Sequence, residues 1–121
     1  IFWLLALSKP RGVLGDKFNP VDDPEIYKAI SPIYNIPEAS TRKLPPQLLT
    51  AATKDRITPI QMIKEYGCAL EEKNQEFEYW EHINRNHAYL DSGRTLIAGN
   101  DFIRDGVPAL KVMMDFFAKH L

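Results

Sequence analysis

Two residues of this chain, Asp55 and His87, have side chains that together could move a proton during catalysis. A carboxylate that accepts the Nδ1–H of an imidazole fixes the tautomer of the ring and stabilises the imidazolium that forms when the other nitrogen takes a proton from a nucleophile. Each residue comes just after an apolar segment that is a candidate strand. Because ligands and chemistry collect outside the carboxyl ends of parallel strands, we expect Asp55 and His87 to meet there as acid and base.

Either residue alone is typical of a loop, since Asp is a favoured turn residue and a histidine in a polar loop is commonly solvated. The shared position at strand ends is what singles out the pair. The other two histidines have structural interpretations, because His82 lies inside a candidate strand and His120 lies at the end of the chain.

Three segments are predicted as strands and three as helices. The strands are residues 1–7, 47–52 and 77–83, and the helices are residues 24–30, 59–73 and 106–120. Helix signals separate the strands, and this alternation is typical of a parallel sheet with helices on both faces. We therefore predict an α/β fold with three parallel strands in sequential order and flanking helices.

The helices carry apolar residues at helical spacing. In residues 59–73, one face should pack on the sheet through Ile60, Ile63, Tyr66, Gly67 and Leu70. In residues 106–120, one apolar stripe is formed by Val107, Leu110, Met114, Phe117 and Leu121. Asp105 could cap this last helix, and the residues before it, from about 84, are predicted as a loop.

The chain opens on seven consecutive apolar residues, 1–7. Such a run is typical of a parallel strand buried on both faces, and a buried strand needs a neighbour on each side to satisfy its backbone groups. No segment before it supplies the first neighbour. We therefore expect residues 1–121 to be the C-terminal part of a single domain that belongs to a larger protein.

The composition of the chain excludes several classes of binding partner. The net charge is −1 with 26% charged residues, which provides no basic surface for nucleic acid or for an anionic membrane. The opening apolar run is too short to span a bilayer. Cys68 is the only cysteine, so an internal disulfide and a thiolate metal cluster are excluded, and we expect it to be a buried, inert thiol. We expect no metal and no cofactor, and both a cytoplasmic and a secreted location stay open.

Four strings resemble segments of α/β-hydrolases, most of all the hormone-sensitive-lipase-like carboxylesterases. They are Ile-Ser-Pro-Ile-Tyr at 30–34, Leu-Pro-Pro-Gln-Leu-Leu at 44–49, Asp-Arg-Ile-Thr-Pro at 55–59 and His-Ala-Tyr-Leu-Asp-Ser at 87–92. They resemble, in order, the segment before the acid-bearing strand, the entry to that strand, the turn with the catalytic acid and the segment with the catalytic histidine. The resemblance covers about residues 30–121 and is weaker over residues 1–29.

This resemblance implies the last part of an α/β-hydrolase domain, with Asp55 as the triad acid and His87 as the triad base. The serine nucleophile of such enzymes sits in a Gly-x-Ser-x-Gly turn. None of the four serines, Ser8, Ser31, Ser40 and Ser92, has glycines at that spacing. Since the triad order is Ser, acid, His, we expect the nucleophile upstream of Ile1, in the N-terminal part of the same protein.

The expected activity is that of a serine hydrolase that cleaves carboxylic esters of small substrates through an acyl-enzyme. A prolyl-oligopeptidase-like peptidase is the first alternative. Many such peptidases carry a substrate-binding Arg two residues after the acid, but here Arg56 follows Asp55 directly and Ile57 holds the later position. The second alternative is a hydrolase-like binding module without catalysis.

Overall fold

The computed structural model describes residue 18, residues 21–88, residue 90, residues 93–94 and residues 99–121. The chain divides into two compact units, residues 1–37 and 38–121, which are described separately below. The strand predicted at residues 1–7 lies outside the described residues.

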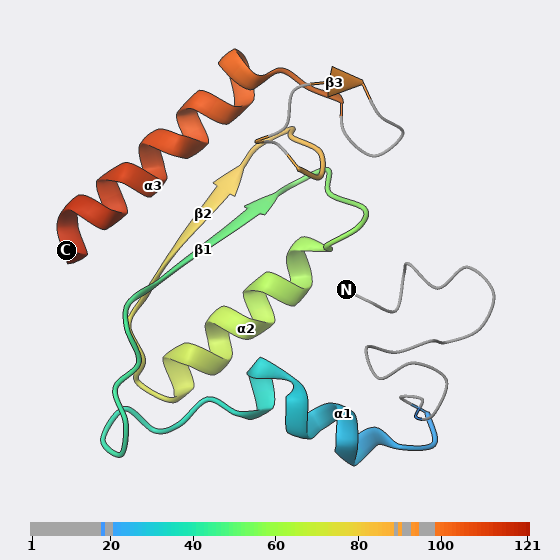
Figure 1. The fold of residues 1–121 in the computed structure, drawn as a ribbon, viewed down its shortest axis with the longest axis vertical. Helices are drawn as coiled ribbons and strands as arrows, with labels where there is room; N and C mark the ends of the chain where they lie inside the picture. The colour runs from blue at the N-terminus through green and yellow to red at the C-terminus, as the bar shows by residue number, and fades with distance from the viewer. Residues whose placement is uncertain (1–17, 19–20, 89, 91–92, 95–98) are drawn as a thin grey trace. The chain divides into compact units, whose positions relative to one another are not determined.

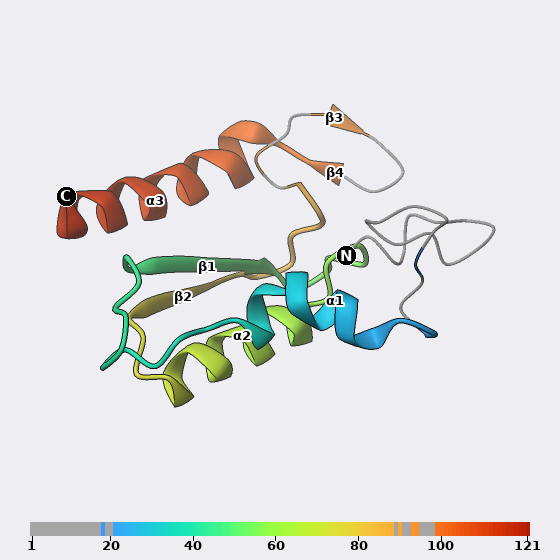
Figure 2. The ribbon, with the colours of Figure 1, turned by 60° about the horizontal axis from the view of Figure 1, so that its bottom comes forward.

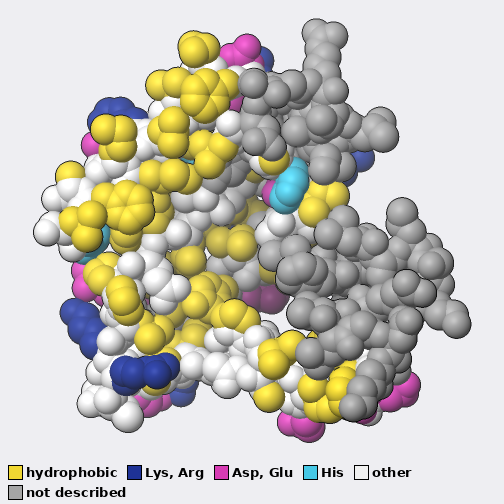
Figure 3. Space-filling model, viewed as in Figure 1, with side chains coloured by type: hydrophobic (Ala, Val, Ile, Leu, Met, Phe, Trp, Pro, Cys, Tyr) yellow, Lys and Arg dark blue, Asp and Glu magenta, His cyan; other side chains and the backbone are white. Residues whose placement is uncertain are grey.

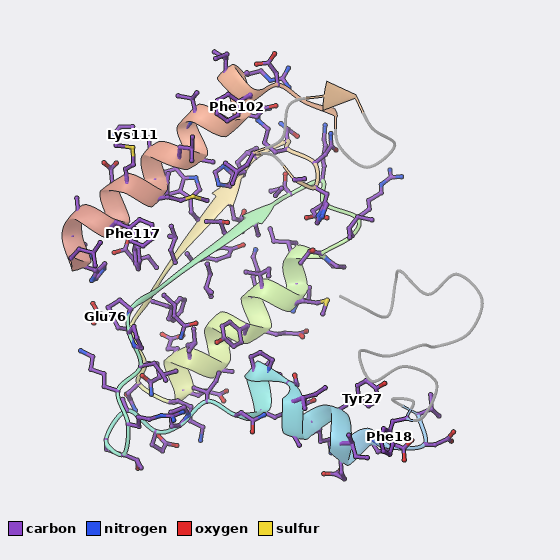
Figure 4. All side chains as sticks on the ribbon, in the orientation of Figure 1. Phe18, Tyr27, Glu76, Phe102, Lys111 and Phe117 are labelled. Carbon is purple, nitrogen blue, oxygen red and sulfur yellow. The ribbon has the colours of Figure 1, made fainter. Side chains whose placement is uncertain are left out.

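In the first unit, a short helix forms where the sequence predicts it. Helix α1 runs over Pro24–Ile30 and is followed by a 3-10 turn over Pro32–Tyr34. Pro24 occupies the start of the helix, where its missing N–H costs no hydrogen bond. The amide nitrogen Nδ2 of Asn35 lies within 3.1 Å of three carbonyl oxygens at the end of α1. The Tyr27 hydroxyl donates to the carbonyl of Phe18 at 3.0 Å (Figure 4).

The second unit contains a parallel pair of strands with a helix on each face. Strand β1, Gln47–Ala52, pairs in parallel with β2, Phe77–His82 (Figure 1). Helix α2, Ile60–Glu72, connects them and covers one face, and α3, Val107–His120, covers the other (Figure 2). The α/β prediction is therefore confirmed for these two strands and their helices. Within the described residues this parallel sheet has two strands, so a third strand is not shown.

Alternate strand residues point to the two helices, because successive side chains of a strand lie on opposite faces. Leu49 and Phe77 contact α2 at Gly67, which is buried as predicted; a Cβ there would lie 3.2 Å from the Phe77 ring. The absence of a side chain thus lets α2 approach the sheet. Cys68 is exposed, so its prediction as a buried thiol is wrong. The next position along a helix is turned about 100° away from a packed neighbour such as Gly67.

Helix α3 packs on the sheet with a different side from its predicted apolar stripe. The buried residues of α3 are Ala109 and Phe116. The stripe itself is exposed, with 70% of Met114 and 54% of Phe117 open to solvent. Hydrophobic side chains accordingly lie over α3 in Figure 3. Lys111, which is labelled in Figure 4, forms an exposed ion pair with Asp115 one turn further along the helix.

The segment between β2 and α3 is more regular than the predicted loop. It contains the short antiparallel strands β3, Gly93–Arg94, and β4, Gly99–Asn100, and then a π-helical turn over Phe102–Gly106. Asp101 accepts a hydrogen bond from the backbone N–H of Arg104 at this turn. The prediction that Asp105 caps α3 is wrong, since Gly106 precedes the helix and the Asp105 carboxylate has other partners.

Candidate active site at the carboxyl end of the sheet

The parallel register of the two strands places two loops at one end of the sheet. Ala52 at the end of β1 pairs with His82 at the end of β2. Asp55 and His87 follow these two strand ends in the chain. Because parallel strands have their carboxyl ends at the same edge, both loops leave the sheet side by side.

Three hydrogen bonds join the loop after β1 to the end of β2 and to the loop that follows it. The backbone N–H of Thr53 donates to the carbonyl of His82 at 3.2 Å, and that of Lys54 donates to the carbonyl of Arg85 at 2.9 Å. The hydroxyl oxygen of Thr53 accepts the backbone N–H of Asn84 at 2.8 Å. The loops are thus fixed to each other through the backbone, independently of the candidate catalytic side chains.

The Asp55 carboxylate is held by its own loop and by His87. One oxygen, Oδ1, accepts the backbone N–H groups of Ile57 and Thr58, each at 2.8 Å. The other, Oδ2, lies 2.8 Å from Nδ1 of His87. Both donors belong to the turn just before α2, so this turn fixes the direction of the carboxylate. Exposure is 10% for the Asp55 side chain and 31% for that of His87.

The geometry assigns the tautomer of His87. Since a carboxylate only accepts hydrogen bonds, Nδ1 must carry the proton that bridges to Asp55. In the neutral ring, Nε2 is then the nitrogen that can accept a proton. The pair predicted from the sequence is therefore brought together in the arrangement that a general base and its orienting acid require.

A cavity of about 250 Å³ adjoins the pair. Both site side chains line it, together with residues of β1, α2 and the loop after β2. These lining residues are Thr50, Ala51, Ala52, Thr58, Ile63, Ala88 and Leu90. These residues present apolar groups and threonine hydroxyls to the cavity, which suits a small organic group next to the imidazole.

The other two histidines lie elsewhere. His82 is buried at the end of β2, and its ring centroid lies 6.5 Å from that of Trp80. Burial, and secondarily the charge of Arg85, lowers the pKa of His82, which favours the neutral ring. His120 lies at the opposite end of the sheet, with Nε2 at 3.2 Å from Oε1 of Glu78.

Several features of the site were not predicted from the sequence. The backbone N–H groups that hold Asp55 are one of them, although an Asp followed closely by Thr-Pro is a signal for such a turn. Another is an ion pair between Arg85, in the loop with His87, and Asp105, before α3. Nothing in the local sequence links these two residues, because their contact depends on the fold.

Among the described residues, no cluster of three or more His, Cys, Asp or Glu side chains could hold a metal ion. A search of the same part of the chain finds no helix with the length and apolarity needed to cross a membrane.

Comparison of the chain with protein families, with curated proteins and with solved structures found no match.

Proposed function

We propose that this chain supplies the acid and the base of a serine hydrolase that cleaves carboxylic esters of small substrates. The observation that carries the proposal is the contact between Asp55 and His87, with the second oxygen of Asp55 held by two backbone N–H groups. The adjoining cavity, which the imidazole lines, supports it. The resemblance of residues 30–121 to carboxylesterases is a second, separate support.

In the proposed reaction, Nε2 of His87 removes the proton from a serine hydroxyl as the serine oxygen attacks the ester carbonyl. Asp55 stabilises the imidazolium, which then gives its proton to the leaving alcohol as the acyl-enzyme forms. Water next attacks the acyl-enzyme, His87 again takes the proton, and the carboxylic acid leaves as the serine regains its hydrogen. Both bonds that break are thereby matched by proton transfers through one nitrogen.

The serine belongs, in this proposal, to the N-terminal part of the same protein, in a Gly-x-Ser-x-Gly turn. Its backbone N–H groups would also help to stabilise the oxyanion. The hydrolase architecture and the third parallel strand at residues 1–7 are part of the proposal. It names no cofactor and no metal.

The test is hydrolysis of a short-chain p-nitrophenyl ester by the full-length protein and its variants. We expect His87→Ala to abolish turnover, because it removes the general base. His120→Ala is the matched control, since it also removes a histidine beside a carboxylate and should leave turnover near the wild-type rate. A His87→Ala variant that folds and keeps the wild-type rate would overturn the proposal. Faster cleavage of a proline-containing peptide anilide than of any ester would favour the peptidase alternative instead.

A further inference from the structure

We propose that Asp105 is a positioning residue that holds the His87 loop through Arg85. The inference deepens the proposed function and rests on it for its activity measurement. It stands on an ion pair between two segments that are distant in the sequence, one next to the candidate base and the other at the start of α3. The Nε of Arg85 donates to Oδ1 of Asp105 at 2.6 Å.

The Asp105 carboxylate is buried and binds several groups at once. Its side chain has 0% exposure, and both oxygens accept hydrogen bonds. Arg104 donates from Nε to Oδ1 at 2.7 Å and from Nη2 to Oδ2 at 2.6 Å. The backbone N–H of Asp101 donates to Oδ2 at 2.8 Å. A buried carboxylate is costly to leave without a charged partner, so Asp105 resists any displacement of Arg85.

Arg85 joins three segments. Its side chain reaches Asp105, its carbonyl accepts the N–H of Lys54 in the loop with Asp55, and its own N–H donates to the carbonyl of His82 at the end of β2. His87 follows shortly in the same loop. Fixing Arg85 therefore fixes the direction in which the chain approaches His87.

The backbone around His87 needs such support. Asn84 and Ala88, on either side of the loop, have φ angles of 59° and 53°. Asparagine tolerates this left-handed region, but an alanine persists there only where the surrounding structure holds it. The hydrogen bonds of Arg85 and Asn84 hold the backbone between β2 and His87 in place.

If Asp105 only stabilised the fold, the loss of either arginine that binds it would have the same effect on turnover. Arg104 therefore distinguishes a structural role of Asp105 from a positioning role. Arg85 and Arg104 both bind the Asp105 carboxylate, but only Arg85 belongs to the loop that carries His87. Replacing either arginine by methionine removes one ion pair with the same buried group. Only the Arg85 variant should also disturb the imidazole.

The experiment compares Arg85→Met and Arg104→Met in the full-length protein, with ester turnover and histidine NMR as measurements. We expect Arg85→Met to lower kcat by about 10²-fold with little change in KM, because misplacing a catalytic group by about 1 Å has an effect of this size. Arg104→Met should keep kcat within about threefold of wild type while both lose thermal stability. Should Arg85→Met fail to fold, Arg85→Lys, which keeps the charge but loses the Nε donor, should show a smaller fall in kcat.

The ring ¹⁵N signals of His87 keep the two proposals distinguishable. We expect them to show the Nδ1-protonated tautomer in wild type and in Arg104→Met, and a mixture of tautomers in Arg85→Met. Equal losses of kcat in the two variants, or an unchanged His87 tautomer in Arg85→Met, would overturn the role of Asp105. If instead His87→Ala keeps full ester turnover, the proposed function fails, and the NMR comparison still decides whether Asp105 positions His87.

Discussion

The β1–β2 sheet has a histidine beside carboxylates at each of its two ends, and the two arrangements hold the carboxylate differently. At the carboxyl end, Asp55 is fixed by two backbone N–H groups and directs its other oxygen to His87. At the amino end, His120 contacts Glu78, whose Oε1 also accepts from Nζ of Lys119 at 2.6 Å. A carboxylate and an imidazole therefore meet at both ends, but in two different environments.

Exposure and competition distinguish the two ends. The Asp55 side chain is 10% exposed, whereas that of Glu78 is 39% exposed. Lys119, and secondarily His120, lowers the pKa of Glu78, but solvent and salt screen such exposed pairs. Moreover, an ammonium shares the Glu78 oxygen with the imidazole. Within the described residues, the carboxylate beside His87 is thus held by backbone N–H groups, whereas the carboxylate beside His120 also binds a cation. This difference makes Asp55 and His87 the better candidate for a catalytic pair.

The largest expected effect comes from breaking the pair at the carboxyl end. In the full-length protein, Asp55→Asn should lower ester turnover by about 10⁴-fold, by analogy with serine proteases, because the amide no longer enforces the tautomer of the base. The backbone hydrogen bonds can still be accepted by the amide oxygen, so the fold should remain. Glu78→Gln is the matched change at the amino end, and its turnover should stay near wild type. A similar loss in both variants would mean that the two ends do not differ in function.

The pairing of Asp55 with His87 was predictable because it follows from local signals. Each residue comes shortly after an apolar segment, and parallel pairing alone brings the ends of such segments together. The bounds of β1 follow likewise from the flanking Pro45-Pro46 and the polar turn after Ala52.

The rest depends on packing that the sequence pattern does not contain. The apolar stripe of α3 has helical spacing, but the side that packs on the sheet is set by small and aromatic residues, Ala109 and Phe116. Likewise, Asp105 has the sequence context of a helix cap. The contact with Arg85 arises only because the loop after β2 and the start of α3 are brought together in the fold. Contacts of this kind have no periodicity that a sequence could show.

The second prediction compares a buried with an exposed carboxylate through pH. Hydrogen bonding to Arg104, with further help from the Asp101 N–H and Arg85, lowers the pKa of Asp105 from 3.8 to about 2. The pKa of Asp105 is lower in the folded than in the unfolded protein. Its charge therefore stabilises the fold above pH 3.8, and this contribution is lost as the pH falls through about 2. Urea midpoints of wild type and Asp105→Asn should therefore differ at neutral pH and converge towards pH about 2. A Glu78→Gln variant should show a much smaller and salt-dependent difference, since its charge is solvated.

A third prediction sharpens the contrast by damaging the amino end without touching catalysis. Gln75 is buried there, and its Oε1 accepts the N–H of Leu44 while its Nε2 donates to the carbonyl of Arg42. Gln75→Ala should lower the free energy of unfolding by about 1–2 kcal/mol, because both of these hydrogen bonds are lost. The loss is modest because hydrogen bonds between neutral groups are weaker than those of charged groups. Urea denaturation measures this loss. The kcat of the folded variant should be unchanged, and a fall in kcat as large as that of Asp55→Asn would contradict the separation of the two ends.

The smallest expected effect tests backbone strain at the two ends. Ala88, next to His87, and Asn74, after α2, share a φ of 53°. A left-handed alanine costs about 1–2 kcal/mol, and glycine relieves this but gains about 0.4–1 kcal/mol of conformational freedom in the unfolded chain. Ala88→Gly should therefore stabilise the protein by about 0.5 kcal/mol. Asn74→Gly should give less, since asparagine tolerates the left-handed region. Thermal unfolding of both variants measures the difference, and a larger gain at Asn74 than at Ala88 would show that the loop beside His87 carries no special strain.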